Sequence, residues 1–266
     1  MTMLPSRFPL VAAFVLLAST GLACGDDSPT QPDVTNDRIG RVLFLGNSLT
    51  YTNNLPVMVD SLAAASGIEV QCTAITDGGF GLIDHYASAS RRAAVLNGHF
   101  DWVILQQGPS SLDESRDSLI AWSELWEPLI KASGAKGAMY AVWPERDRFY
   151  AFPAVSESYR LAAERIDALF LPVGDSWLET WARNPNIGLY GRDNFHPAVA
   201  GTYVAAVAIV SMLAGRPAIS LSTRYTVPRS IGAPIDSTAA ATIRAAVDAV
   251  VERNRMVEAR PTGRPD

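Results

Sequence analysis

The chain has 266 residues, of which 48% are hydrophobic and 18% are charged. This composition is typical of a globular protein with one sizeable core, and it excludes an intrinsically disordered chain. The net charge is −5 and no cluster of Lys or Arg stands out, so a nucleic-acid partner is not expected. Cys24 and Cys72 are the only cysteines, which is too few for a cysteine-based metal site.

The first residues predict a secretory signal. Arg7 is followed by an apolar run at 8–18 and then by small residues up to Cys24. This is the order of a positive start, a hydrophobic segment and a cleavage region. The run is too short for a good transmembrane span. We therefore expect residues 1–23 to be a signal peptide and the mature protein to be exported, either to the cell envelope or outside the cell.

Cys24 stands where a bacterial lipoprotein signal has its acylated cysteine. The segment resembles the lipobox, displaced by one residue, because Leu22 is the apolar position and Gly21 precedes it. We expect Cys24 to be lipidated, which would attach the protein to a membrane surface without a spanning helix. Plain secretory cleavage near the same point is the alternative. If Cys24 is lipidated, Cys72 has no disulfide partner within the chain, and we expect it to be a small core residue.

Short apolar runs, each followed by a helical pattern, organise the rest of the chain. Continuous apolar runs predict strands buried on both faces, as in a parallel sheet. They lie at 42–45, 68–75, 102–105, 138–143 and 169–173, and helical patterns lie at 55–65, 111–133, 154–169 and 236–252. The alternation predicts one α/β domain, a three-layer α/β/α sandwich with roughly five parallel strands.

The domain boundaries follow from composition. Residues 24–38 are rich in Asp, Pro, Ser, Thr and Asn and predict a flexible tether, whereas the Pro- and Gly-containing residues 257–266 predict a disordered tail. The domain is therefore expected over 39–256. The segment 197–215 has no charged residue, but Pro197 at its start and Gly215 at its end favour a buried helix over a transmembrane span.

Ser48 lies just beyond the expected first strand. The strand end reads Leu45-Gly46-Asn47-Ser48, and ligands bind at the carboxyl ends of strands in a doubly wound sheet. Position 50 is Thr, so this is not the Gly-x-Ser-x-Gly elbow of the α/β-hydrolases. Taken alone, Ser48 is better explained as the cap of a turn.

Asp193 and His196 supply what a serine nucleophile needs. A serine hydroxyl reacts when a base takes its proton, and histidine titrates in the right range to do so. A carboxylate on the other ring nitrogen orients that histidine. The sequence Asp193-Asn194-Phe195-His196-Pro197 can form a tight turn that brings carboxylate and ring together, with Pro197 keeping His196 extended.

Together these segments resemble the SGNH hydrolase superfamily, also called GDSL-type esterases. Gly46-Asn47-Ser48-Leu49 matches the first block, with Asn47 where the name-giving motif has Asp, and residues 193–196 match the Asp-x-x-His block. The resemblance covers about residues 41–215. It implies a flavodoxin-like sandwich and a serine esterase with a triad of Ser48, His196 and Asp193, which needs no metal and no organic cofactor.

The resemblance also implies an oxyanion hole, in which the amide of Ser48 takes part. Gly79 is the expected glycine of the second block, with Gly78 as the alternative. Most members have Gly-x-Asn-Asp after the third strand, but this chain has Gln106-Gln107-Gly108, and some carbohydrate acetylesterases of the superfamily have Gln-Gly there. Gln107 is the expected donor and Gln106 the alternative, because successive strand residues point in opposite directions.

The expected reaction is hydrolysis of an ester through an acyl-enzyme. A short acyl group on a small molecule or a carbohydrate, such as an O-acetyl group, fits an exported enzyme. The departures at Asn47 and in the third block also fit a non-catalytic, glycan-binding surface lipoprotein. A carboxylate-pair glycosidase would need two facing acids, and only Asp175 and Asp193 stand out.

Several other residues near strand ends have a structural and a functional interpretation. His85 is expected to be packed or solvated, although it could line a cleft. Tyr51, Phe80 and Trp143 could form a sugar-stacking wall, and such aromatics more often belong to the core or the rim.

Overall fold

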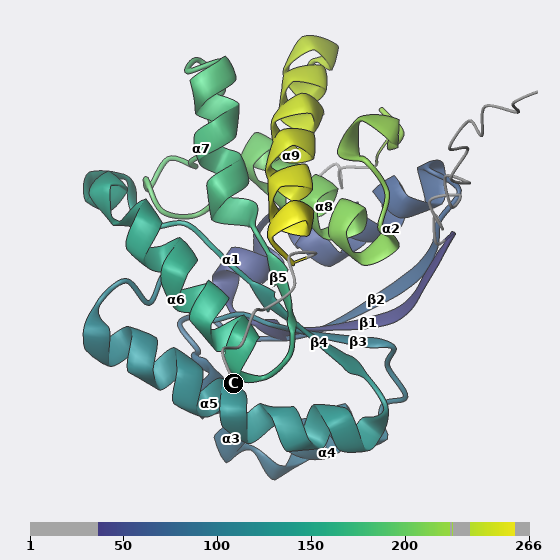
Figure 1. Ribbon diagram of the computed structural model, residues 1–266, viewed down its shortest axis with the longest axis vertical. Coiled ribbons are helices and arrows are strands. Elements are labelled where there is room, and N and C mark those ends of the chain that lie inside the picture. The colour runs from purple at the N-terminus through teal and green to yellow at the C-terminus, as the bar shows by residue number, and fades with distance from the viewer. Residues whose placement is uncertain (1–36, 224, 226–234, 259–266) are drawn as a thin grey trace, which may run out of the picture. The chain divides into compact units, whose positions relative to one another are not determined.

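The computed structural model describes residues 37–223, 225 and 235–258 (Figure 1). The predicted signal peptide, Cys24 and nearly all of the predicted tether lie outside these residues, as do residues 259–266 of the predicted tail. In the described part of the chain, no helix combines the length and the apolar character needed to cross a membrane.

Five parallel strands form one sheet in the order β2-β1-β3-β4-β5. This is the doubly wound order in which the strand sequence reverses between β1 and β3, and that reversal opens a crevice at the carboxyl edge. The predicted α/β sandwich with five parallel strands is therefore confirmed. The strands are β1 (Arg38–Gly46), β2 (Glu69–Thr76), β3 (Trp102–Leu105), β4 (Lys136–Tyr140) and β5 (Leu169–Leu171).

Helices cover both faces of the sheet (Figure 1). One face carries α2 (Leu55–Ala65), α7 (Val173–Arg183), α8 (Val199–Ala214) and α9 (Ser237–Glu258). The other carries α3 (Leu82–Ala87), α4 (Ala89–Asn97), α5 (Asp113–Ser133) and α6 (Phe152–Arg165). The short elements are α1 (Ser48–Tyr51) and the 3₁₀ turns η1 (Thr52–Asn54), η2 (Arg146–Ala151) and η3 (Ala218–Ser220).

The edge strand β2 differs from its prediction. Residues 42–46 of the central strand β1 are all buried, as a strand covered on both faces requires. Every residue of β2 is exposed or half-buried, because a strand at the edge of the sheet pairs on one side only and is less covered by helices. Cys72 on β2 is accordingly a half-buried free thiol at the margin of the core, and not a fully buried core residue.

The charge-free segment 197–215 is a buried helix, as its flanking residues predict. Every residue of α8 from Ala200 to Ala214 is buried, and the helix packs against α2, α7 and α9. Gly215 ends it with a φ of +66°, a conformation that favours glycine. The residues just before α8 are those of the predicted Asp-x-x-His block, so the packing of this helix anchors that block.

Candidate active site

Ser48 is the first residue of α1, immediately beyond the carboxyl end of β1. Asn47 caps this helix, since its Oδ1 accepts a hydrogen bond from the amide of Leu49 at 3.0 Å. Its Nδ2 donates to the carbonyl of Phe80 at 2.9 Å. Asn47 therefore joins the first block to the loop after β2, and it does so with an amide donor that the Asp of the name-giving motif would lack.

The side chain of Gln106 fixes the position of the first block through hydrogen bonds. It is fully buried, and its Oε1 accepts from the Asn47 amide at 2.9 Å and from the Thr50 hydroxyl at 2.7 Å. Its Nε2 donates to Asn47 Oδ1 at 2.9 Å and to the Gln107 carbonyl at 2.5 Å. Both amide hydrogens are thus in use, so Gln106 is suited to positioning the segment that carries Ser48 and has no donor left for an oxyanion.

The close approach of Gln106 also explains Gly46. A Cβ at this position would lie 2.4 Å from Gln106 Oε1 and 2.7 Å from Thr50 Oγ1. Only glycine allows the buried glutamine to reach the backbone at the end of β1.

Ser48, Gly79 and Gln107 line one cleft of about 480 Å³. Gln107 Nε2 donates one hydrogen bond, to Ser110 Oγ at 2.9 Å, and has a second hydrogen available. Among the residues that the structure describes, the amides of Ser48 and Gly79 have no acceptor. Gly79 has a φ of +75°, and a Cβ there would meet nothing within 4 Å, so its backbone is open to a ligand. Gly78 does not line this cleft.

Asp193 and His196 form the predicted pair. His196 Nδ1 lies 2.6 Å from Asp193 Oδ2, while Asp193 Oδ1 accepts from the amides of Phe195 and His196 at 3.1 and 3.0 Å. The hydrogen bond from the His196 ring, followed by these backbone donors, lowers the pKa of Asp193. A carboxylate held in this way keeps the ring oriented and leaves Nε2 as the ring nitrogen that the carboxylate does not contact.

Three contacts fix the loop that carries His196. The Trp143 indole donates to the Phe195 carbonyl at 2.9 Å, and the Gly191 amide donates to the His196 carbonyl at 2.7 Å. Asn53 Nδ2 donates to the Pro197 carbonyl at 2.8 Å. Asn53 follows Ser48 by five residues, so it links the segment of Ser48 directly to the residue after His196.

The two halves of the predicted triad are not in contact. Ser48 lines the cleft, whereas on the side of the pair it is Phe195, beside His196, that lines it, and neither His196 nor Asp193 does. In the described part of the chain the Ser48 hydroxyl has no hydrogen bond, to His196 or to any other group, and Ser48 is half-buried. Hydrogen bonds between a nucleophile and its base commonly tighten when substrate binds.

Backbone strain is concentrated around these residues. Six non-glycine residues in the described ranges have positive φ, and four of them, Asn53, Asn54, Ser110 and Asn194, belong to segments already named. Left-handed backbone is costly for non-glycine residues and is retained where the surroundings require it, which is often at functional sites. The pair Asn53-Asn54 was a signal in the sequence, since Asn tolerates this conformation, but sequence reasoning missed it.

Comparison with known proteins finds relatives by structure only. No protein-family model and no curated protein sequence matches the chain. A protein from Slackia heliotrinireducens assigned to the SGNH hydrolases is 27% identical, with a TM-score of 0.55 over 65% of this chain and 98% of that one. A DUF4886 family protein from Bacteroides uniformis is 17% identical, with a TM-score of 0.66 over 80% and 95%. A catalytic mutant of Axe2, an acetylxylan esterase from Geobacillus stearothermophilus, is 18% identical, with a TM-score of 0.53 over 69% and 97%.

In its fold this chain is similar to the SGNH hydrolases, to which the Slackia protein is assigned. The match to the Slackia protein supports an enzyme that hydrolyses ester bonds.

Two other residues considered in the sequence, His85 and Trp143, hold the backbone around the candidate site in place. His85 is fully buried, and its Nε2 donates to the Gly46 carbonyl at 2.8 Å while Nδ1 accepts from Arg91 Nη1 at 2.7 Å. Burial lowers the pKa of His85, which keeps the ring neutral. Trp143 is also fully buried and stacked on Trp177, so of its two interpretations the place in the core holds. Phe80 does line the cleft, and Tyr51, the last residue of α1, is exposed.

Asp175 does not contribute to this SGNH cleft. It lies in the first turn of α7, where its Oδ2 accepts from Ser156 Oγ at 2.9 Å, and burial raises its pKa. Neither Asp175 nor Asp193 lines the cleft, so the facing carboxylates that a glycosidase requires are not found among the described residues that form it. The same part of the chain holds no group of His, Cys, Asp and Glu side chains suited to a metal ion.

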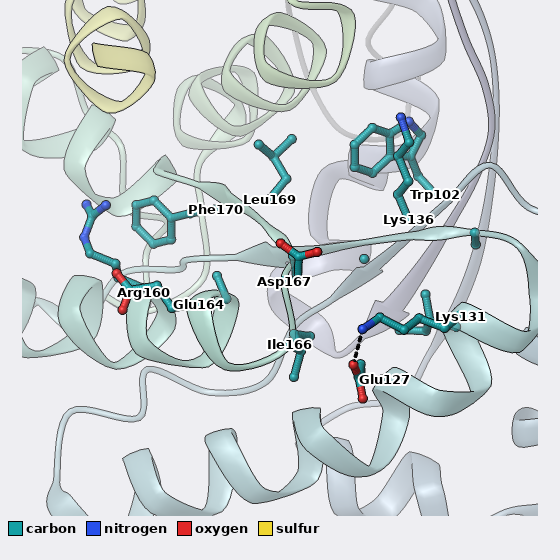
Figure 2. Close-up of a pocket in the computed structure, with 15 residues that line it drawn as sticks. Trp102, Glu127, Lys131, Lys136, Arg160, Glu164, Ile166, Asp167, Leu169 and Phe170 are labelled. Atoms are coloured by element: carbon teal, nitrogen blue, oxygen red, sulfur yellow. Dashed lines mark ion pairs between the residues drawn. The ribbon is translucent and has the colours of Figure 1, made fainter. Parts of the chain in front are cut away.

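A larger hollow, of about 990 Å³, lies at the opposite edge of the sheet (Figure 2). Its lining includes Trp102, Lys136 and Leu169, the first residues of β3, β4 and β5. Figure 2 shows Lys131 directed toward Glu127, with which it forms an ion pair at 2.5 Å. In a parallel sheet the amino ends of the strands are remote from the catalytic edge, so this hollow is not part of the SGNH site.

Proposed function

We propose that this protein is an exported serine esterase in which Ser48 is the nucleophile, His196 the general base and Asp193 the residue that orients it. The observation that carries the proposal is the convergence of an accessible serine, two backbone amides with no acceptor among the described residues and the spare hydrogen of Gln107 in one cleft. Catalysis of acyl transfer requires such donors around the developing oxyanion.

The proposed reaction has two steps. His196 takes the Ser48 proton as Oγ attacks the ester carbonyl, and the amides of Ser48 and Gly79 with Gln107 Nε2 hold the oxyanion. Collapse breaks the bond to the alcohol, which leaves with the proton from His196. Water, deprotonated by His196, then attacks the acyl-enzyme and releases the acid and Ser48.

The acyl group is proposed to be short, as in O-acetyl esters of carbohydrates. The cleft, of about 480 Å³, has room for a short acyl group together with part of its alcohol. The similarity in fold to Axe2, an acetylxylan esterase, supports the class of reaction.

The decisive experiment is covalent labelling with a fluorophosphonate together with turnover of para-nitrophenyl acetate. The wild-type protein should be labelled on Ser48 and should turn over the ester. Ser48→Ala should lose both properties while its circular dichroism spectrum is unchanged, whereas Ser118→Ala, at another serine of the same cleft, should still take the label. A folded wild-type protein that neither labels nor hydrolyses would favour the glycan-binding alternative.

Attachment to a membrane through a diacylated Cys24 is a separate proposal, based on the lipobox-like sequence alone. When the full-length chain is expressed in a bacterium, the mature protein should partition into detergent and carry the mass of the lipid on its first residue. Cys24→Ser should move it to the aqueous phase. A wild-type protein that is already aqueous and cleaved near residue 23 would contradict lipidation and leave the esterase proposal intact.

A further inference from the structure

Arg148 is an unusual residue in the lining of the cleft. The cleft is otherwise lined by Gly, Ser, Asn, Gln, Pro and apolar side chains, and within the described residues Arg148 is the one lining residue with a formal charge. A single cation in a neutral binding cleft calls for a partner of opposite charge.

The backbone directs Arg148 away from its neighbours in η2. The turn is kinked at this residue, with a φ of −106° and a ψ of 30°. Phe149 and Tyr150 are 47% and 77% exposed, whereas Arg148 is half-buried. The side chain reaches across to the loop after β3, where its Nη2 donates to Ser111 Oγ at 2.9 Å.

The guanidinium is held in place without being neutralised. Ser111 is an uncharged partner, and Arg148 forms no ion pair with any carboxylate of the described residues. A half-buried guanidinium has lost part of its hydration, and a planar fork of donors is well matched to a carboxylate or a similar anion. The chain as a whole carries a net charge of −5, so a local cation is what would allow an anionic substrate to enter.

The surroundings of Arg148 indicate which half of the ester it would meet. The η2 turn is bonded to the loop of the catalytic histidine, since the Arg146 amide donates to the Asn194 carbonyl at 2.9 Å. In the proposed mechanism His196 protonates the departing alcohol, so the alcohol half of the ester lies on the side of this loop.

We propose that Arg148 binds an anionic group on the alcohol half of the substrate, which makes the protein an esterase for acylated acidic alcohols such as acylated sugar acids. This inference rests on the proposed esterase function. It assigns to Arg148 a role in substrate selection and none in the chemical steps.

The test uses two acetate esters that differ in one charge, para-acetoxybenzoate and para-acetoxybenzamide. The full-length wild-type protein should have the higher kcat/KM for the anionic ester relative to the neutral one. Arg148→Gln should lower that ratio by about tenfold or more, the size expected for a charge-assisted hydrogen bond, mostly through KM. Arg148→Lys should keep part of the preference, because an ammonium retains the charge but not the fork.

A matched variant controls for the overall electrostatic field of the protein. Arg165→Gln removes the same charge from the exposed far end of α6, where Arg165 pairs with Glu124 at 3.6 Å. It should leave the ratio unchanged. The ratio should also fall in wild-type protein at high salt, but not in Arg148→Gln.

The outcomes separate the two proposals. If Arg148→Gln lowered kcat/KM equally for both esters, the role of Arg148 would be structural, through its hydrogen bond to Ser111, and the inference would be wrong. A wild-type protein that hydrolyses para-nitrophenyl acetate but shows no preference for the anionic ester would also overturn it, leaving the esterase function standing. A protein that hydrolyses none of these esters and takes no fluorophosphonate label would contradict both the esterase function and the role of Arg148.

Discussion

Two hollows at opposite edges of one sheet differ in what lines them. The hollow at the amino edge is the larger, about 990 Å³ against about 480 Å³. Its charges include an ion pair, between Lys131 and Glu127 at 2.5 Å. The smaller cleft has instead donors with no partner among the described residues, at the amides of Ser48 and Gly79. Unused polar groups, and not volume, distinguish the site where chemistry can occur.

The direction of the strands causes this difference. All five strands run in parallel, so the loops that leave β1, β2 and β3 meet at one edge and carry Ser48, Gly79 and Gln107 there. The loops at the other edge only bring the chain back into the sheet.

The largest expected effect is at His196. His196→Gln should lower kcat for para-nitrophenyl acetate at least about a thousandfold, because the base of the nucleophile is lost. In the larger hollow, Asp167→Asn should leave kcat/KM within about twofold, since this removes a charge far from the reacting atoms. Steady-state kinetics on both variants would test the contrast, and a comparable loss in Asp167→Asn would show that the amino edge takes part in catalysis.

The next effect concerns Gln107. Gln107→Glu keeps the shape and the Oε1 acceptor but removes the proposed oxyanion donor, so kcat should fall about a hundredfold or more with little change in KM. The melting temperature serves as the control for folding. Unchanged kcat in a folded variant would remove Gln107 from the oxyanion hole.

Gly46 and Gly108 give a matched pair for the packing of the same edge. A Cβ at Gly46 would collide with Gln106 Oε1 at 2.4 Å, whereas a Cβ at Gly108 would meet nothing within 4 Å. Gly46→Ala should lower the free energy of unfolding by about 1–3 kcal/mol, the usual cost of overpacking. Gly108→Ala should change it by less than about 0.5 kcal/mol. Urea denaturation measures both values, and equal costs would contradict the close fit of Gln106.

The smallest effect is the contribution of His85 to pH dependence. Burial lowers the pKa of His85 below its ordinary value of 6.5. The unfolded chain therefore binds a proton in a pH range where the folded protein does not, and stability is lost as pH falls from about 6.5 through the folded pKa. Urea unfolding at pH 7.5 and pH 5.5 should show a smaller loss for His85→Gln than for the wild-type protein, because glutamine does not titrate. An identical loss in the two proteins would mean that other groups control this range.

Local patterns in the sequence were sufficient for the fold class and for the Asp-x-x-His pair. Apolar runs and helical periods are read over short windows, and their alternation indicates a parallel sheet covered by helices. The pairing of Asp193 with His196 is likewise local, because a turn of four residues closes it.

Tertiary structure decided everything that depends on residues far apart in the chain. The exposure of β2 follows from its place at the edge of the sheet, which its own apolar residues do not encode. Gln106 and Gln107 are adjacent, yet they differ in their contacts. Gln106 hydrogen-bonds to groups 56 and 59 residues away in the chain, whereas Gln107 lines the cleft. Asn53 bonds to Pro197 across 144 residues, and Arg148 enters the cleft through a kink in a short turn. Hydrogen bonds are satisfied in three dimensions, so only the folded chain shows which donors remain free.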